Sequence, residues 1–158
     1  MILKFCKECC ECCQEDGYLD IFMSHSDVKK INADCVKKTG QLYKFKKSEN
    51  FVCHFLSLTG CRLEEKKRPL DCRLFPMTFN LNKNKPEFFF LDACPKISEI
   101  PINWIEKTMK EATSELKNWS KKEIMAYVKT EPQWRAIPIR LKKNEKMQRK
   151  KLSRWAGN

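Results

Sequence analysis

The sequence predicts a small, loop-rich α+β domain with short strands, followed by a C-terminal helical pair and a basic tail. Three observations lead to this fold class. All ten cysteines lie within the first 94 of the 158 residues. Leu, Ile, Val and Phe make up only about 23% of the chain, close to the composition at which apolar burial alone no longer sustains a fold. The sulfur-free remainder carries apolar side chains at helical spacing.

The first hundred residues predict short elements. Residues 18–23 have the composition of a strand. Ser24 or Ser26 then offers an N-cap for a short helix that runs to Ile31. Residues 88–91 predict a second strand. Because the cysteines are spread among and between these segments, we expect loops and single turns to position most of them.

The second part predicts two helices. Asn103 and Glu106 form a capping-box pattern for the first helix. Ser120 and Glu123 repeat this pattern for the second helix, which must end before Pro132. One face of the first helix and its continuation is apolar, comprising Ile105, Met109, Ala112, Leu116 and Trp119. We expect the helical pair to cover the first part of the chain with this face.

The charge divides the chain into the same parts. Residues 1–100 carry 17 Lys and Arg against 14 Asp and Glu, whereas residues 101–158 carry 15 against 6. Only four glycines are present and no Gly/Ser linker separates the parts, so we expect them to pack together. The predicted organisation is a cysteine-cluster domain over residues 1–100, a helical cap over 101–131 and a basic tail over 132–158.

Hydropathy favours a cytoplasmic protein that does not contact a membrane. The longest apolar runs are far shorter than the roughly 20 residues that cross a bilayer. The first residues lack the apolar stretch of a secretory signal. In a reducing compartment, clustered cysteines indicate metal ligation or thiol chemistry more often than disulfides.

The N-terminal cysteines carry the strongest signal. Five of the eight positions from residue 6 to residue 13 are cysteines, and four of them form a CxxCxxCC pattern: Cys6, Cys9, Cys12 and Cys13. Two residues between cysteines let both sulfurs reach one metal ion or adjacent irons. Five half-cystines in eight residues would make a crowded disulfide hub. The pattern therefore predicts a metal or cluster site.

The other cysteines lie in distinctive contexts. Residues 53–56 read CHFL, residues 60–63 read GCRL, and residues 68–76 read RPLDCRLFP, before an ACP string at residues 93–95. With CxxCxxCC in front, this order resembles the CxxCxxCC-type zinc- or iron-chelating (YkgJ-like) cysteine-cluster family over about residues 6–95. The resemblance implies a metal-binding protein with eight cysteine ligands, namely Cys6, Cys9, Cys12, Cys13, Cys53, Cys61, Cys72 and Cys94. Cys10 and Cys35 fall outside the pattern and are expected to be free thiols.

Eight thiolates could hold one or two iron–sulfur clusters (4Fe-4S), one cluster with a zinc ion, or zinc alone. We favour iron–sulfur over zinc, because closed four-cysteine zinc sites need no adjacent pair such as Cys12 and Cys13. Arg62 and Arg73, each directly after a cysteine, could offset the negative charge of the thiolates, or could be ordinary surface arginines. Because the chain has few apolar side chains to bury, we expect the domain to be metal-stabilised. A metal site would supply on the order of 10 kcal/mol of folding free energy.

Two other functions stay open. Flagellin lysine N-methylases have a similar cysteine core, so the resemblance also allows an iron–sulfur-dependent enzyme related to protein lysine N-methylases. The acid–base groups near the cysteines are expected to be solvated charges rather than catalysts: His54, Glu64, Glu65 and Asp71.

The second alternative is a nucleic-acid-associated protein with a structural metal site. Residues 135–154 carry nine Lys and Arg against one Glu, and Trp134 and Trp155 bracket them. The same segment also fits a solvated tail.

Overall fold

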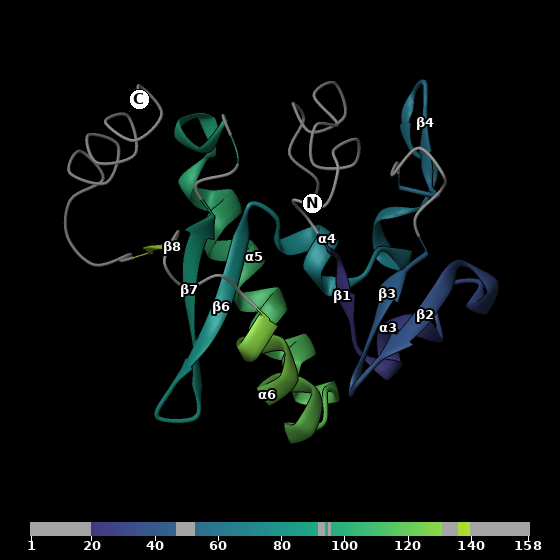
Figure 1. The fold of residues 1–158 in the computed structure, drawn as a ribbon. Helices are drawn as coiled ribbons and strands as arrows, with labels where there is room; N and C mark the ends of the chain where they lie inside the picture. The colour runs from purple at the N-terminus through teal and green to yellow at the C-terminus, as the bar shows by residue number, and fades with distance from the viewer. Residues whose placement is uncertain (1–19, 47–52, 92–93, 95, 131–135, 140–158) are drawn as a thin grey trace.

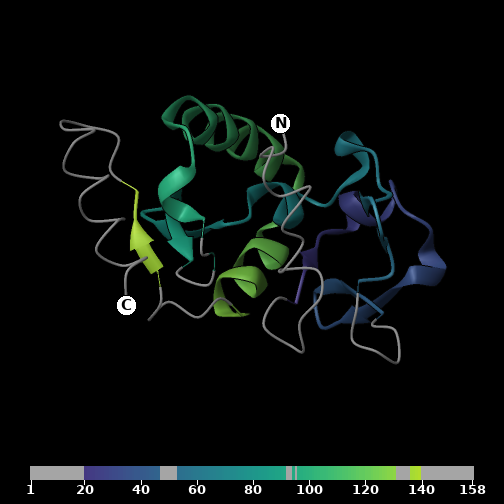
Figure 2. The ribbon, with the colours of Figure 1, turned by 90° about the horizontal axis from the view of Figure 1, so that it is seen from above.

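The structure is a computed structural model, and it describes residues 20–46, 53–91, 94, 96–130 and 136–139. The described chain forms two lobes with a short helix between them (Figures 1 and 2). The small lobe holds a three-stranded sheet, helix α3 (His25–Val28) and a two-stranded hairpin. The large lobe holds another three-stranded sheet with helices α5 (Ile102–Glu115) and α6 (Lys121–Thr130). Helices and small antiparallel sheets confirm the predicted α+β fold class.

The sheet of the small lobe separates two hydrophobic clusters. Its antiparallel strands lie in the order β1 (Phe22–Met23), β3 (Leu42–Phe45), β2 (Val36–Thr39). Gly40, with φ at +61°, makes the turn between β2 and β3 in a conformation that favours glycine. Side chains alternate along β3, so Leu42 enters the large cluster of the molecule. Phe45 instead joins Met23 and Val36 in a separate small cluster.

The sheet of the large lobe contains strands that the sequence analysis missed. Its order is β6 (Met77–Asn82), β7 (Lys85–Leu91), β8 (Ala136–Pro138), all antiparallel. The predicted strand at residues 88–91 is the end of the seven-residue strand β7. Lys83 and Asn84 connect β6 to β7 with φ of 49° and 63°, as a two-residue turn with two left-handed positions requires. Strand β8 lies inside the segment assigned to the basic tail.

Both predicted helices form, but only one starts as predicted. Ser120 and Glu123 cap α6 reciprocally, each side chain accepting a hydrogen bond from the other residue's backbone N–H, at 3.2 and 2.7 Å. Helix α5 instead begins after Pro101, and the Asn103 prediction is wrong. Pro101 already holds φ at −68°, which prepares the chain for the helix without a side-chain cap. The predicted apolar face is confirmed, since Met109 is partly buried and the other four residues are buried.

The start of helix α3 also agrees with the sequence prediction. Ser24 is its N-cap, and the Ser24 hydroxyl and backbone both bond to Asp27 in a capping box. The helix ends at Val28 rather than at Ile31, and the strand before it covers only Phe22 and Met23 within the described residues. Within the described residues, no helix has both the length and the apolar character needed to cross a bilayer.

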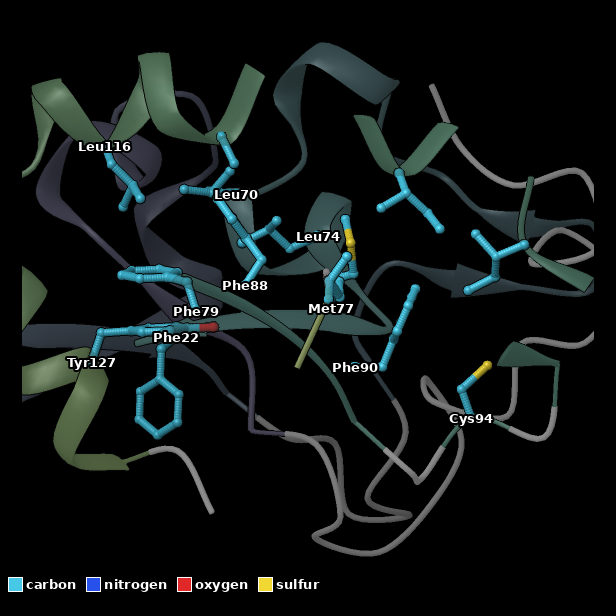
Figure 3. Close-up of a cluster of buried hydrophobic side chains, with 14 of the residues drawn as sticks. Phe22, Leu70, Leu74, Met77, Phe79, Phe88, Phe90, Cys94, Leu116 and Tyr127 are labelled. Carbon is cyan, nitrogen blue, oxygen red and sulfur yellow. The ribbon is translucent and has the colours of Figure 1, made fainter. Parts of the chain in front are cut away.

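The large cluster joins the two predicted halves of the chain (Figure 3). Its buried residues include side chains from β1, β3, α4, β6, β7 and both long helices. At its centre, the rings of Phe79 and Tyr127 stack with centroids 4.6 Å apart, and Trp119 stands edge-on to Tyr127. Residues 101–130 are thus part of the same core as the cysteine-bearing segments.

Candidate metal centre

Two of the predicted ligands flank a hairpin in the small lobe. Cys53 precedes strand β4 (Leu56–Ser57), and its carbonyl accepts a 2.9 Å hydrogen bond from Leu56 N. Cys61 ends strand β5 (Gly60–Cys61), directly opposite Leu56. Both cysteines are partly buried. The hairpin therefore fixes the backbone of Cys53 relative to that of Cys61.

Cys72 lies on helix α4 (Leu70–Leu74), the short helix between the lobes (Figure 1). Leu70 and Leu74, four residues apart, face the large cluster. Cys72 lies about 200° around the helix from Leu70, so it faces the other way. There it packs, together with Cys53, against the small cluster formed by Met23, Val36 and Phe45.

Arg68 connects the hairpin to α4. Its Nε donates to the carbonyl oxygen of Leu63 at 3.1 Å, and its Nη2 donates to that of Cys61 at 3.5 Å. The carbonyl of Arg68 in turn accepts from Nε of Arg73 at 3.0 Å. The residues that lead into and out of Cys61 and Cys72 are thus held together by side-chain-to-backbone hydrogen bonds.

Glu115 holds α4 from the large lobe. Its carboxylate accepts hydrogen bonds from Nη2 of Arg73 and from Nζ of Lys30, the latter at 2.7 Å. Burial raises the pKa of Glu115, but the hydrogen bonds from Arg73 and Lys30 outweigh burial and hold this pKa below its ordinary value. The charged carboxylate therefore links α5 to α4 and to the segment after α3.

Within the described residues, the hydrogen bonds of Arg62 and Arg73 go to oxygen atoms, and their role in offsetting thiolate charge stays a prediction. The guanidinium of Arg73 donates hydrogen bonds to the carboxylate of Glu115 and to the carbonyl oxygen of Arg68. The guanidinium of Arg62 donates to the carbonyl of His54 at 2.6 Å and is exposed. Both arginines therefore stabilise the protein around the cysteines through bonds to oxygen.

Asp71 is a buried structural residue, and its prediction as a solvated charge is wrong. Its Oδ2 accepts from Phe22 N at 2.9 Å, and its Oδ1 accepts from the Tyr127 hydroxyl at 2.6 Å. Asp27, also buried, accepts from Leu70 N at 3.3 Å. The sequence did hold a signal for a structural role of Asp71, because an acidic residue in the first turn of a helix after a proline is favourable there. No local pattern in the sequence indicated the ion pairs of Glu115. His54, Glu64 and Glu65 are exposed, as predicted.

The remaining cysteines are distributed between the clusters and the undescribed segments. Cys94 is buried in the large cluster, and Cys35 is buried beside β2. Four of the predicted ligands lie outside the described residues, as does Cys10: Cys6, Cys9, Cys12 and Cys13. No disulfide joins any two of the five cysteines in the described ranges. In those ranges, no three Cys, His, Asp or Glu side chains form a group that could hold a metal ion.

Comparison of the chain with family models, with curated proteins and with solved structures found no match.

Proposed function

We propose that this chain is a metal-binding protein whose cysteines ligate one or two iron–sulfur clusters, or zinc. The observation that carries the proposal is that Cys53 and Cys72 both pack against the small cluster. These two partly buried residues come from the segment before a hairpin and from a helix that are separated in the sequence.

The donor set suits such a centre. Thiolates are the ligands that iron–sulfur clusters and structural zinc sites use, and the partly buried positions of Cys53, Cys61 and Cys72 limit solvent access. We assign these three as ligands, together with Cys6, Cys9, Cys12 and Cys13 of the CxxCxxCC segment. Cys94 completes the set on the strength of the sequence pattern. A bound cluster would supply electron transfer, and zinc would supply a structural crosslink.

The residues around the thiols would hold them in place. Arg68 anchors the backbone at Cys61, while Glu115 and Arg73 anchor the helix that carries Cys72. Pro69 and Pro76, both fully buried, bracket that helix. We expect these braces to keep the sulfur positions restricted before metal binds, which lowers the entropic cost of ligation.

The test is metal analysis of protein purified without oxygen. We expect stoichiometric iron and acid-labile sulfide, with a charge-transfer absorption band and an electron paramagnetic resonance signal after reduction. Stoichiometric zinc without sulfide would select the zinc form. Cys72→Ser should lower the bound metal by at least half, because one ligand of a closed site is lost.

Cys35→Ser is the matched control, since Cys35 is a buried cysteine outside the ligand pattern. Folded wild-type protein free of iron and zinc would overturn the proposal. So would a loss of metal in Cys35→Ser as large as that in Cys72→Ser.

The methylase alternative gains less support. Asp71, the most sheltered of the candidate acid–base residues, is engaged by Phe22 and Tyr127. We therefore propose no catalytic residue. A change in the cluster spectrum on adding S-adenosylmethionine would favour the enzyme instead.

A further inference from the structure

Two rings form an unusual surface where α3 meets β3. His25 is exposed and Tyr43 is half-buried, with ring centroids 6.1 Å apart and an interplanar angle of 37°. The Tyr43 hydroxyl lies 3.4 Å from Nδ1 of His25. Both rings stand on ordered backbone, because Tyr43 is paired with Met23 in the sheet and His25 N donates to Oε1 of Glu123 at 2.6 Å. The pair is thus a fixed aromatic platform at the surface.

Lysines stand on the elements that carry the two rings or adjoin them. Lys38 on β2 is directly opposite Tyr43, so both side chains emerge on the same face of the sheet. Lys29 follows His25 by one helical turn. Two more lysines, Lys121 and Lys122, lie in the first turn of α6, the helix whose Glu123 bonds to His25 (Figure 1).

Within the described residues, no ion pair offsets the charge of these lysines. All four lysines are exposed. The adjoining carboxylate, that of Glu123, is buried and accepts hydrogen bonds from two backbone N–H groups. Burial raises the pKa of Glu123, but the hydrogen bonds from His25 and Ser120 outweigh it and hold this pKa below its ordinary value.

We propose that this surface, which we call the His25–Tyr43 face, binds single-stranded nucleic acid. Unpaired bases stack on the two rings, and the phosphates contact Lys29 and Lys38. Aromatic platforms flanked by cations bind single strands, because every base offers a flat face while the backbone offers regular negative charge. In a duplex the base faces are stacked on one another, so they could not stack on the two rings. An acidic peptide could form ion pairs with the lysines but would have no bases to stack on the rings.

This surface differs from the basic segment at residues 135–154, of which only residues 136–139 are described. None of the residues of the His25–Tyr43 face belongs to the proposed ligand set, but Tyr43 packs against the same small cluster as Cys53 and Cys72, so binding is compared at equal metal content. The chain's net charge of +12 supports a polyanionic partner in general, and the rings select the single strand.

The experiment measures binding of a fluorescein-labelled 12-nucleotide oligouridylate to the full chain, as purified, by fluorescence anisotropy at several salt concentrations. His25→Ala should weaken binding by roughly fivefold or more, because one stacking surface is lost. The double variant Lys29→Gln/Lys38→Gln should weaken binding as well. It should also reduce the slope of log affinity against log salt by about 1.4, the value for two lost phosphate contacts on a single strand.

The matched control is Lys83→Gln/Lys85→Gln, which removes the same charge at the exposed β6–β7 turn. Circular dichroism and metal content should match the wild type in every variant. The proposal is overturned if the control loses as much affinity as Lys29→Gln/Lys38→Gln, or if His25→Ala binds like the wild type. It is also overturned if a duplex, anionic vesicles or an acidic peptide compete as well as the unlabelled single strand.

Discussion

The carboxylate of Asp71 on α4 accepts a 2.6 Å hydrogen bond from the hydroxyl of Tyr127 on α6, inside the protein. The same hydroxyl lies 3.1 Å from Oγ1 of Thr78 on β6. Asp71 also accepts from the backbone of Phe22 on β1. One buried carboxylate therefore joins elements of both lobes.

We expect Tyr127→Phe to destabilise the protein by about 1–3 kcal/mol, because the buried carboxylate of Asp71 loses the hydrogen bond from the Tyr127 hydroxyl. The ring stacks on Phe79 in both proteins, so packing changes little. Urea denaturation measures the difference. Tyr43→Phe, whose hydroxyl is exposed, is the control and should change stability by less than about 0.5 kcal/mol. Equal effects of the two variants would show that the Asp71 network contributes nothing of its own.

Acid should weaken the contact between the lobes through Glu115. Its folded-state pKa lies below the ordinary value of 4.5, so the folded state binds the proton less readily than the unfolded chain. The stabilisation is therefore fully present above pH 4.5, and it is lost as the pH falls through the folded-state pKa.

Glu115→Gln tests this dependence. We expect it to lower the free energy of unfolding by about 1–2 kcal/mol at pH 7, since Arg73 and Lys30 lose a charged acceptor. The difference from the wild type should shrink below pH 4.5, as measured by urea denaturation between pH 7 and pH 3. Glu111→Gln, an exposed residue of the same helix, should behave like the wild type. A constant difference at every pH would exclude the proposed titration.

Removal of metal should loosen the lobes unequally. Among the described residues, the small cluster has three buried members, whereas the large cluster has eighteen. On anaerobic chelation we expect amide hydrogen exchange to speed up first in β1–β3 and around α4. Strands β6 and β7 should keep most of their protection, because only one of the buried residues described for the large cluster, Cys94, is a proposed ligand. Unchanged exchange in the small lobe would contradict a stabilising role for the metal.

Local signals in the sequence predicted local structure well. Ser120 with Glu123 marked the start of α6, and Ser24 with Asp27 closed the cap of α3. The same pattern at Asn103 failed because Pro101 had already set the backbone for α5. Strand β6 escaped prediction although its alternating residues precede a two-residue turn, so the signal existed.

The surroundings of the cysteines could not be predicted in the same way. Cys72 lies on α4 between Asp71 and Arg73, and both neighbours bond to distant residues. Arg73 bonds to Glu115, 42 residues away, and Asp71 bonds to Tyr127, 56 residues away. Such pairs leave no periodicity or motif in the sequence. The cysteine spacing indicated which residues to consider, and the long-range hydrogen bonds of α4 decide where Cys72 lies.

The carboxylates of Asp71, Glu115 and Glu123 also bear on how this protein can be dissected. A fragment that stops at residue 100 would retain every thiol but lose Glu115, Glu123 and Tyr127. The backbone N–H of His25 and the guanidinium of Arg73 would then lose Glu123 and Glu115 as acceptors, and seven of the eighteen buried residues described for the large cluster would be missing. Truncation studies of the cysteine region should therefore keep the chain through residue 139.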